Sequence, residues 1–143
     1  MCGRFALEST SEHLSQAFRL NKSIPIEPRY NIAPSQDVAI IRENRGKRIS
    51  FTRWGLIPHW AKDRNIGSRL INARAETLAE KPSFRDSFQS RRCLIPATGF
   101  YEWQTRGTTK QPYFITMKNR SLFAMAGLWE SWQDKNASSE SEP

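Results

Sequence analysis

The sequence contains 143 residues, of which 38% are apolar and 25% are charged. This length and balance fit one globular domain with a buried core and argue against a second full domain. No apolar run approaches the roughly 20 residues of a membrane-spanning helix, and the N-terminus lacks the basic-then-apolar order of a secretory signal. We therefore expect a soluble, cytoplasmic protein with no membrane partner.

The chain is strongly basic, with 22 Lys and Arg residues against 14 Asp and Glu residues, a net charge of +8 and a pI near 10.0. An excess of cationic surface attracts polyanions and speeds their encounter with the protein. This charge is typical of nucleic-acid-binding proteins, but it also fits a generally basic protein whose Lys and Arg side chains are solvated.

The sequence predicts the local structure of two segments near the N-terminus. Residues 9–12, with the S-x-x-E pattern of a capping box, predict a short amphipathic helix that continues through Leu14 and Phe18. The following stretch Ile24–Ser35 contains three prolines. Because proline cannot donate a backbone hydrogen bond, we expect an extended loop without strand pairing there.

The rest of the chain indicates strands around a central helical region. Six segments rich in β-branched and aromatic residues predict strands: Val38–Arg42, Ile49–Ile57, Cys93–Ala97, Phe100–Gln104, Tyr113–Met117 and Leu122–Trp129. Between the second and third, short helical pieces are expected on either side of Pro82. The prediction is an α+β fold with a mainly antiparallel, barrel-like sheet, a domain over residues 2–132 and a disordered polar tail over 133–143.

Cys2 carries the most specific chemistry in the sequence. Once Met1 is removed, this residue holds an α-amine and a thiol on adjacent carbons, with ordinary pKa values near 8 and 8.5. An aldehyde can form a Schiff base with the amine, and the thiol can then close a five-membered thiazolidine ring. The alternative is a small buried apolar residue at position 2. With only one other cysteine, Cys93, a disulfide scaffold is excluded and Cys2 is expected to be a free thiol.

Aromatic and basic residues provide candidate contacts to nucleic acid. Trp54, His59 and Trp60 lie around one turn, and indole rings can stack on unpaired bases, while Trp residues in most domains are simply core. Nearby arginines can follow the phosphates; they are Arg53, Arg64 and Arg69.

Two further segments hold polar groups suited to catalysis. In "NARAET", Asn72 can donate and accept hydrogen bonds, Arg74 can bind a phosphate oxygen, and Glu76 follows closely. In "PATGFYEW", Glu102 lies among aromatic residues, which raise the pKa of a carboxyl group and suit it to proton transfer. Glu102 also fits a surface position on a strand.

Metal and nucleotide cofactors are not indicated. The possible zinc ligands, Cys2, Cys93, His13 and His59, include no close C-x-x-C or H-x-x-x-H pair. The sequence has neither a glycine-rich phosphate loop nor a G-x-S-x-G turn.

The segments "MCGRF", "RYNIAPSQ", "WGLIPHW", "NARAET", "CLIPATGFYEW" and "AGLWESW" occur in this order between Cys2 and about Trp132. In this combination the chain resembles the SOS response-associated peptidase family, whose members sense abasic sites in single-stranded DNA. The resemblance implies a β-rich α+β fold around a positively charged groove and covalent capture of the open-chain sugar aldehyde by Cys2.

The resemblance also implies roles for individual residues. Asn72 would orient Cys2 and the sugar, and Glu102 would move protons during ring opening and thiazolidine formation. Three residues, Arg4, Arg74 and Trp103, would hold flanking phosphates, and Trp54 would pack against bases beside the lesion. The peptidase activity in the family name would be the self-processing that exposes the cysteine, alongside a weak abasic-site lyase activity.

One feature departs from the family pattern. The family carries a further catalytic histidine in an H-x-R-M-P motif beyond "AGLWESW", and this sequence ends at Pro143 without it. We expect a C-terminally shortened, monomeric domain that forms the crosslink but reverses it poorly. The alternatives are a non-covalent single-stranded DNA-binding module and an amidohydrolase that uses Cys2 as its N-terminal nucleophile.

Overall fold

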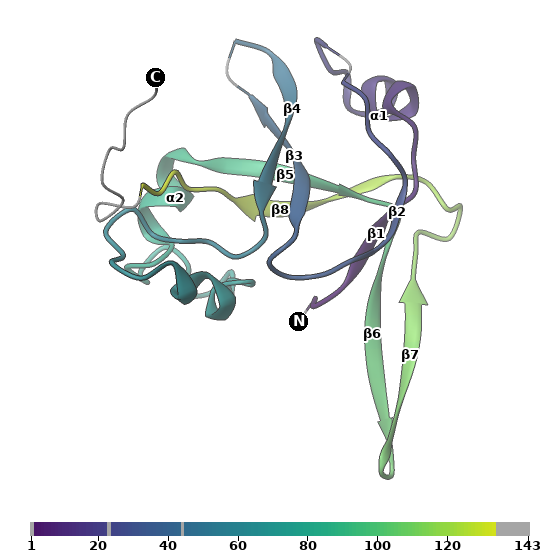
Figure 1. Ribbon diagram of the computed structural model, residues 1–143. Coiled ribbons are helices and arrows are strands. Elements are labelled where there is room, and N and C mark those ends of the chain that lie inside the picture. Colours follow the sequence, from purple (N-terminus) through teal and green to yellow (C-terminus); the bar gives the residue numbers. More distant parts are fainter. Residues whose placement is uncertain (1, 23, 44, 134–143) are drawn as a thin grey trace, which may run out of the picture.

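Two four-stranded antiparallel sheets form the body of the protein. The computed structural model describes residues 2–22, 24–43 and 45–133. One sheet has the strand order β2-β1-β6-β7 and the other the order β4-β3-β5-β8 (Figure 1). The strands are β1 (Phe5–Leu7), β2 (Arg29–Ile32), β3 (Asp37–Glu43), β4 (Lys47–Arg53), β5 (Arg92–Ala97), β6 (Gly99–Arg106), β7 (Thr109–Ile115) and β8 (Phe123–Leu128). Short helices flank them, which confirms the predicted α+β fold with mainly antiparallel pairing.

All six predicted strands are present, with shifted ends. The largest shifts are in β7, which begins at Thr109 rather than Tyr113, and in β4, which ends at Arg53 rather than Ile57. Gly55, with φ of +126°, turns the chain immediately afterwards, in a conformation that side chains disfavour. A β-carbon at Gly55 would also collide with the carbonyl oxygen of Gly67. The apolar residues after Arg53 therefore belong to a loop packed against residues 67–71.

The prediction of an unpaired loop at Ile24–Ser35 is wrong for its second half. Residues Arg29–Ile32 form β2, which pairs antiparallel with β1. The prolines at 28 and 34 flank this strand and do not interrupt it, so no ladder hydrogen bond is lost. Strand β1 was not predicted either, because three residues are too few to show an alternating pattern.

The helical predictions are partly correct. Helix α1 (Ser11–Phe18) buries Leu14 as expected, but its N-cap is Thr10, whose hydroxyl accepts from the backbone N–H of His13 at 3.2 Å. Ser9 is instead buried, with its hydroxyl 3.2 Å from Nδ1 of His13. The predicted S-x-x-E capping box is therefore wrong by one residue.

On the C-terminal side of Pro82, helix α2 (Arg85–Ser90) forms as predicted. On its N-terminal side, residues 75–80 form consecutive turns and no α-helix. A 3-10 helix, Arg64–Arg69, precedes this region. Of the predicted polar tail, residues 134–143 lie outside the described residues.

The buried core lies where the two sheets meet, and it is supplied mainly by β3, β1 and β5, with Leu14 added from α1. Every residue of β1 is buried, whereas every residue of β7 is exposed. The β6–β7 hairpin accordingly projects away from the body, as Figure 1 shows. Its base is anchored through β6, which pairs with β1 by Phe5 opposite Phe100 and Ala6 opposite Gly99.

Gly99 is required at this base because β7 crosses it closely. A β-carbon there would overlap the ring of Phe114 and come within 2.9 Å of the carbonyl oxygen of Ile115. We expect Gly99→Ala to lower the free energy of unfolding by about 1–3 kcal/mol, the usual cost of overpacking. Urea denaturation measures this change. Gly3→Ala is the matched control, because no atom lies within 4 Å of its added carbon, and equal losses in both variants would contradict the steric explanation.

Candidate functional site

Strand β1 brings the residues that precede it beside the first residues of β6. The backbone N–H of Tyr101 donates to the carbonyl of Arg4 at 2.9 Å, which extends the β1–β6 pairing by one residue. Residues 2–4 therefore run alongside β6, next to its pairing with β1. Residues 2–5 and 99–103, about 100 residues apart in sequence, thereby meet at one place.

Asn72 reaches the same place from the loop after the 3-10 helix. Its Nδ2 donates to the backbone carbonyl of Cys2 at 2.7 Å. The adjacent residue Ile71 accepts a hydrogen bond from the indole Nε1 of Trp54 at 2.8 Å, which fixes the loop. The amide of Asn72 thus holds the main chain of Cys2 and leaves its thiol to other partners.

The thiol of Cys2 is half-buried and lies 3.6 Å from the carbonyl oxygen of Arg4, to which it donates. Burial raises the pKa of this thiol most, and the negative charge of Glu102 raises it further, whereas hydrogen bonding with the backbone of Arg4 and the positive charge of the N-terminus lower it. The net pKa lies above the ordinary value. Cys2 therefore keeps its thiol proton at neutral pH, and Glu102 lies close enough to act on it electrostatically.

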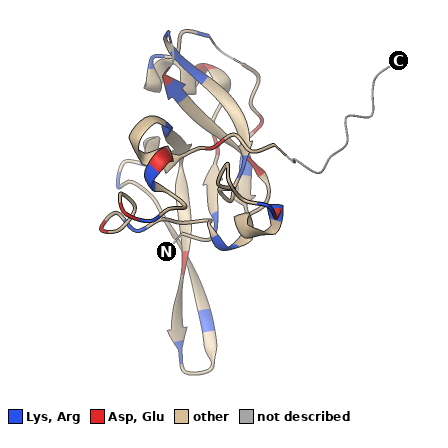
Figure 2. Ribbon diagram, turned by 90° about the vertical axis from the view of Figure 1, so that its left-hand side faces the viewer, with Lys and Arg blue, Asp and Glu red and all other residues tan. Residues whose placement is uncertain are grey.

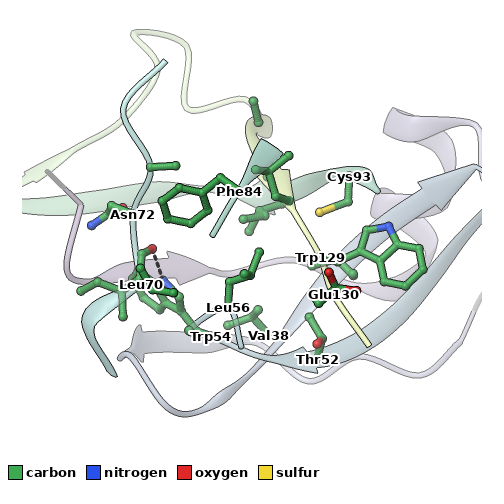
Figure 3. Close-up of a pocket in the computed structure, with 18 of the residues that line it drawn as sticks. Val38, Thr52, Trp54, Leu56, Leu70, Asn72, Phe84, Cys93, Trp129 and Glu130 are labelled. Atoms are coloured by element: carbon green, nitrogen blue, oxygen red, sulfur yellow. Dashed lines mark hydrogen bonds between the residues drawn. The ribbon is translucent and has the colours of Figure 1, made fainter. Parts of the chain in front are cut away.

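A cavity of about 880 Å³ opens next to these residues. Cys2 and Asn72 contribute to its lining, together with Trp54, whose ring packs edge-on against Phe5 at a centroid distance of 5.4 Å. In Figure 3, Asn72 lies at one end of the cavity, and Cys93 and Trp129 lie at the other. Most of the lining side chains are apolar. Trp54 therefore forms part of the cavity wall, and its indole N–H is already bonded to Ile71.

The three remaining predicted contact residues surround this centre. Arg4 donates from Nη1 to Oδ1 of Asn31 at 2.8 Å. Arg74, two residues beyond Asn72, is exposed, and its guanidinium makes no hydrogen bond or ion pair within the described ranges. Trp103 is 43% exposed on β6, next to Glu102 in sequence but on the opposite face of the strand.

A polar cluster that the sequence analysis did not single out is centred on Glu130. Its side chain is only 7% exposed. Its Oε2 accepts from Nη2 of Arg91 at 2.9 Å and from the hydroxyl of Ser87 at 3.2 Å, and lies 3.4 Å from Nδ1 of His59. The cluster joins the loop after β4, helix α2 and the segment after β8. His59, considered above for nucleic-acid contact, is thus engaged with this carboxylate.

Within residues 2–22, 24–43 and 45–133, no group of three or more His, Cys, Asp or Glu side chains is placed to hold a metal ion. In the same ranges, no helix combines the length and apolar character needed to cross a membrane. Lys and Arg residues are distributed over the body and the hairpin, as Figure 2 shows. The excess positive charge is therefore not confined to one end of the molecule.

Comparisons with known proteins agree with this geometry. The family model "SOS response associated peptidase (SRAP)" matches residues 1–142. The abasic site processing protein YoqW of Bacillus subtilis is 50% identical over 137 residues, covering 92% of this chain and 61% of the relative. The abasic site processing protein YedK of Escherichia coli is 34% identical over 135 residues, covering 90% of this chain and 59% of the relative.

Among solved structures, a crystal structure of a protein from Bacteroides thetaiotaomicron superposes with a TM-score of 0.83 at 28% identity. The superposition covers 94% of this chain and 62% of the other. The chain thus spans about three fifths of the length of these relatives. It belongs to the SRAP family.

The electrostatic coupling between Glu102 and Cys2 can be measured directly. Glu102→Gln removes the negative charge that disfavours the thiolate, so the pKa of Cys2 should fall. The rate of alkylation of Cys2, followed by peptide mass spectrometry against pH, should then rise at lower pH than in the wild type. The alkylation of Cys93 can be told apart from that of Cys2, because burial raises the pKa of Cys93 to about 11.

Glu76→Gln serves as the control, because this exposed carboxylate is not among the charges that act on Cys2. An unchanged alkylation profile in Glu102→Gln would show that the two side chains are not coupled.

Proposed function

We propose that this domain recognises abasic sites in single-stranded DNA and captures them covalently through Cys2. The observation that carries the proposal is the convergence of Cys2, Asn72 and Glu102 from three distant segments. Relatives that are up to 50% identical carry the name abasic site processing protein, which supports DNA with abasic sites as the substrate.

The reaction needs both nucleophiles of Cys2 and therefore a free α-amine. Opening of the closed sugar moves one proton from the C1′ hydroxyl to the ring oxygen, and the carboxyl group of Glu102 carries it. The amine then adds to the C1′ aldehyde and a water molecule leaves, giving a Schiff base. The thiol sulfur next bonds to the same carbon while its proton passes to the nitrogen, which closes the thiazolidine.

The electrostatics of the site favour this order of steps. Burial and the negative charge of Glu102 both favour the protonated thiol, which favours attack by the amine before the sulfur. The retained proton is the one that the nitrogen needs at ring closure. Asn72, bound to the carbonyl of Cys2, holds the residue so that both nucleophiles face the same carbon.

The surrounding residues supply binding to the DNA strand. Arg74 is exposed and has unused donors beside Asn72, which suits it to a phosphate. Arg4, directly before β1, and Trp103, on β6, would hold the phosphates on either side of the lesion. Trp54 supports this region from the cavity side and would pack against a neighbouring base with its exposed edge.

Covalent capture is tested with a single-stranded oligonucleotide that carries one abasic site. We expect a band that survives a denaturing gel for the wild type, no such band for Cys2→Ala, and an intact mass that lacks Met1. Native-gel binding without a denaturation-stable band would instead support a non-covalent binding module. A stable crosslink formed by protein that retains Met1 would contradict the thiazolidine.

Glu102→Gln separates proton transfer from binding. The amide keeps the shape and much of the hydrogen bonding but carries no proton, so crosslinking should slow by about 10²-fold or more, the usual contribution of a general acid or base. Affinity for an undamaged strand should stay the same. Equal losses of binding and crosslinking would assign Glu102 a structural role.

Arg74→Ala tests the phosphate contact. The slope of log affinity against log salt should become shallower by about 1, since one fewer phosphate is neutralised, and undamaged and abasic strands should be affected alike. Arg85→Ala removes the same charge from helix α2 and should leave the slope close to that of the wild type. A change confined to abasic strands would place Arg74 at the reacting sugar and contradict its role as a phosphate contact.

A further inference from the structure

A second polar surface lies on the projecting β6–β7 hairpin. Alternate residues of a strand share a face, so Glu102, Gln104 and Arg106 point to the same side of β6. On β7 the residue opposite Glu102 is Tyr113, which therefore lies on this side too. This face, here called the outer track and made of Gln104, Arg106 and Tyr113, continues directly from Glu102 toward the tip.

Arg106 is held in one orientation on the outer track. Its Nη2 donates to the hydroxyl of Tyr113 at 2.6 Å and its Nε donates to Oε1 of Gln104 at 3.1 Å. The Tyr113 hydroxyl donates in turn to the same Gln104 oxygen at 3.2 Å. The guanidinium carbon also lies 6.0 Å from the centre of the Tyr113 ring.

This arrangement leaves a directed set of donors. A guanidinium has five N–H groups, and two of them are used by Gln104 and Tyr113. The other three, including both on Nη1, have no partner in the part of the chain that the structure describes. They form the bidentate edge that matches a phosphate. Holding an exposed arginine in one orientation costs side-chain entropy. Because Gln104 and Tyr113 already hold Arg106, this cost does not reduce the affinity for a phosphate.

The opposite face of the hairpin offers a comparison. Lys110 pairs with Thr105 and lies on the face shared with Trp103. It carries the same charge as Arg106 near the same tip, but its ammonium group makes no hydrogen bond or ion pair within the described ranges. Only one face of the hairpin thus combines a cation with side chains that orient it.

The distance from the proposed reaction centre fixes what the track can reach. Four residues of a strand span about 13 Å, so the backbone of Arg106 lies about that far along β6 from Glu102, while its guanidinium folds back to Tyr113, the residue opposite Glu102. This position, beside Glu102 and not on it, suits a phosphate of a nucleotide that flanks the abasic sugar. We propose that Gln104, Tyr113 and Arg106 form a phosphate subsite for the strand on one side of the lesion, a proposal that rests on the proposed function.

The test compares Arg106→Ala with Lys110→Ala on three abasic oligonucleotides, which have nucleotides on both sides of the lesion, only on its 5′ side or only on its 3′ side. Arg106→Ala should raise the half-saturating concentration for crosslinking about fivefold or more with one kind of flank, and have no effect when that flank is absent. Lys110→Ala should behave like the wild type with all three.

Tyr113→Phe keeps the ring and the charge but removes the hydroxyl that orients Arg106. It should reproduce part of the loss shown by Arg106→Ala, with the same dependence on the flank, while thermal melting confirms that the hairpin is folded. Equal effects of Arg106→Ala and Lys110→Ala, or an effect independent of the flanks, would show general electrostatic attraction and overturn the subsite.

A separate measurement keeps this proposal distinct from covalent capture. If the wild type forms no crosslink, the proposed function fails, yet non-covalent affinity for an undamaged single strand still compares the two variants. The subsite then predicts a salt slope that is shallower by about 1 in Arg106→Ala and unchanged in Lys110→Ala. Identical slopes in wild type and Arg106→Ala would overturn it.

Discussion

The pairing of the three-residue strand β1 with β6 is the constraint on which the candidate site depends. It buries Phe5, Ala6 and Leu7 between neighbouring strands, so the chain has little freedom to slip by one residue without exposing them. This pairing brings Cys2 close enough to Glu102 for the carboxylate to act on its thiol. If the terminus were flexible, the amine and the thiol of Cys2 would not be held near the aldehyde. Much of the rate advantage of having both nucleophiles on one residue would then be lost.

The sequence predicted the chemistry of the site better than its geometry. The amine and thiol of Cys2 follow from covalent structure alone, and the strands that carry Glu102 and Trp103 follow from their aromatic and β-branched residues. The contact of Asn72 with the backbone carbonyl of Cys2 joins residues 70 positions apart and has no local signal. The same holds for the Glu130 cluster, whose members lie up to 71 residues apart. Strand β2 was missed because the density of prolines around it outweighed its four-residue pattern.

Trp54 illustrates why residue type alone does not settle a role. An indole on a turn beside arginines fits base stacking, and an indole in a small domain fits a core. In the structure it has features of both, because its N–H is bonded to Ile71 and its ring packs on Phe5, while part of it lines the cavity. Trp54 therefore connects the loop that carries Asn72 with the cavity wall behind Cys2. Its substitution would therefore disturb the carbonyl contact of Cys2 as well as any contact with a base.

The two halves of β6 lie in different environments, one packed and one exposed to solvent. Near Gly99 and Phe100 the strand packs closely against β1 and β7, and a single added carbon has no space. Beyond Trp103 both strands of the hairpin are solvent-exposed, so burial does not dictate which side chains occupy them. Ordered contacts among exposed polar side chains, such as those of Arg106 with Gln104 and Tyr113, gain little stability in water. Their specific geometry at a fixed distance from Glu102 is therefore better explained by a ligand that runs along the hairpin than by the needs of the fold.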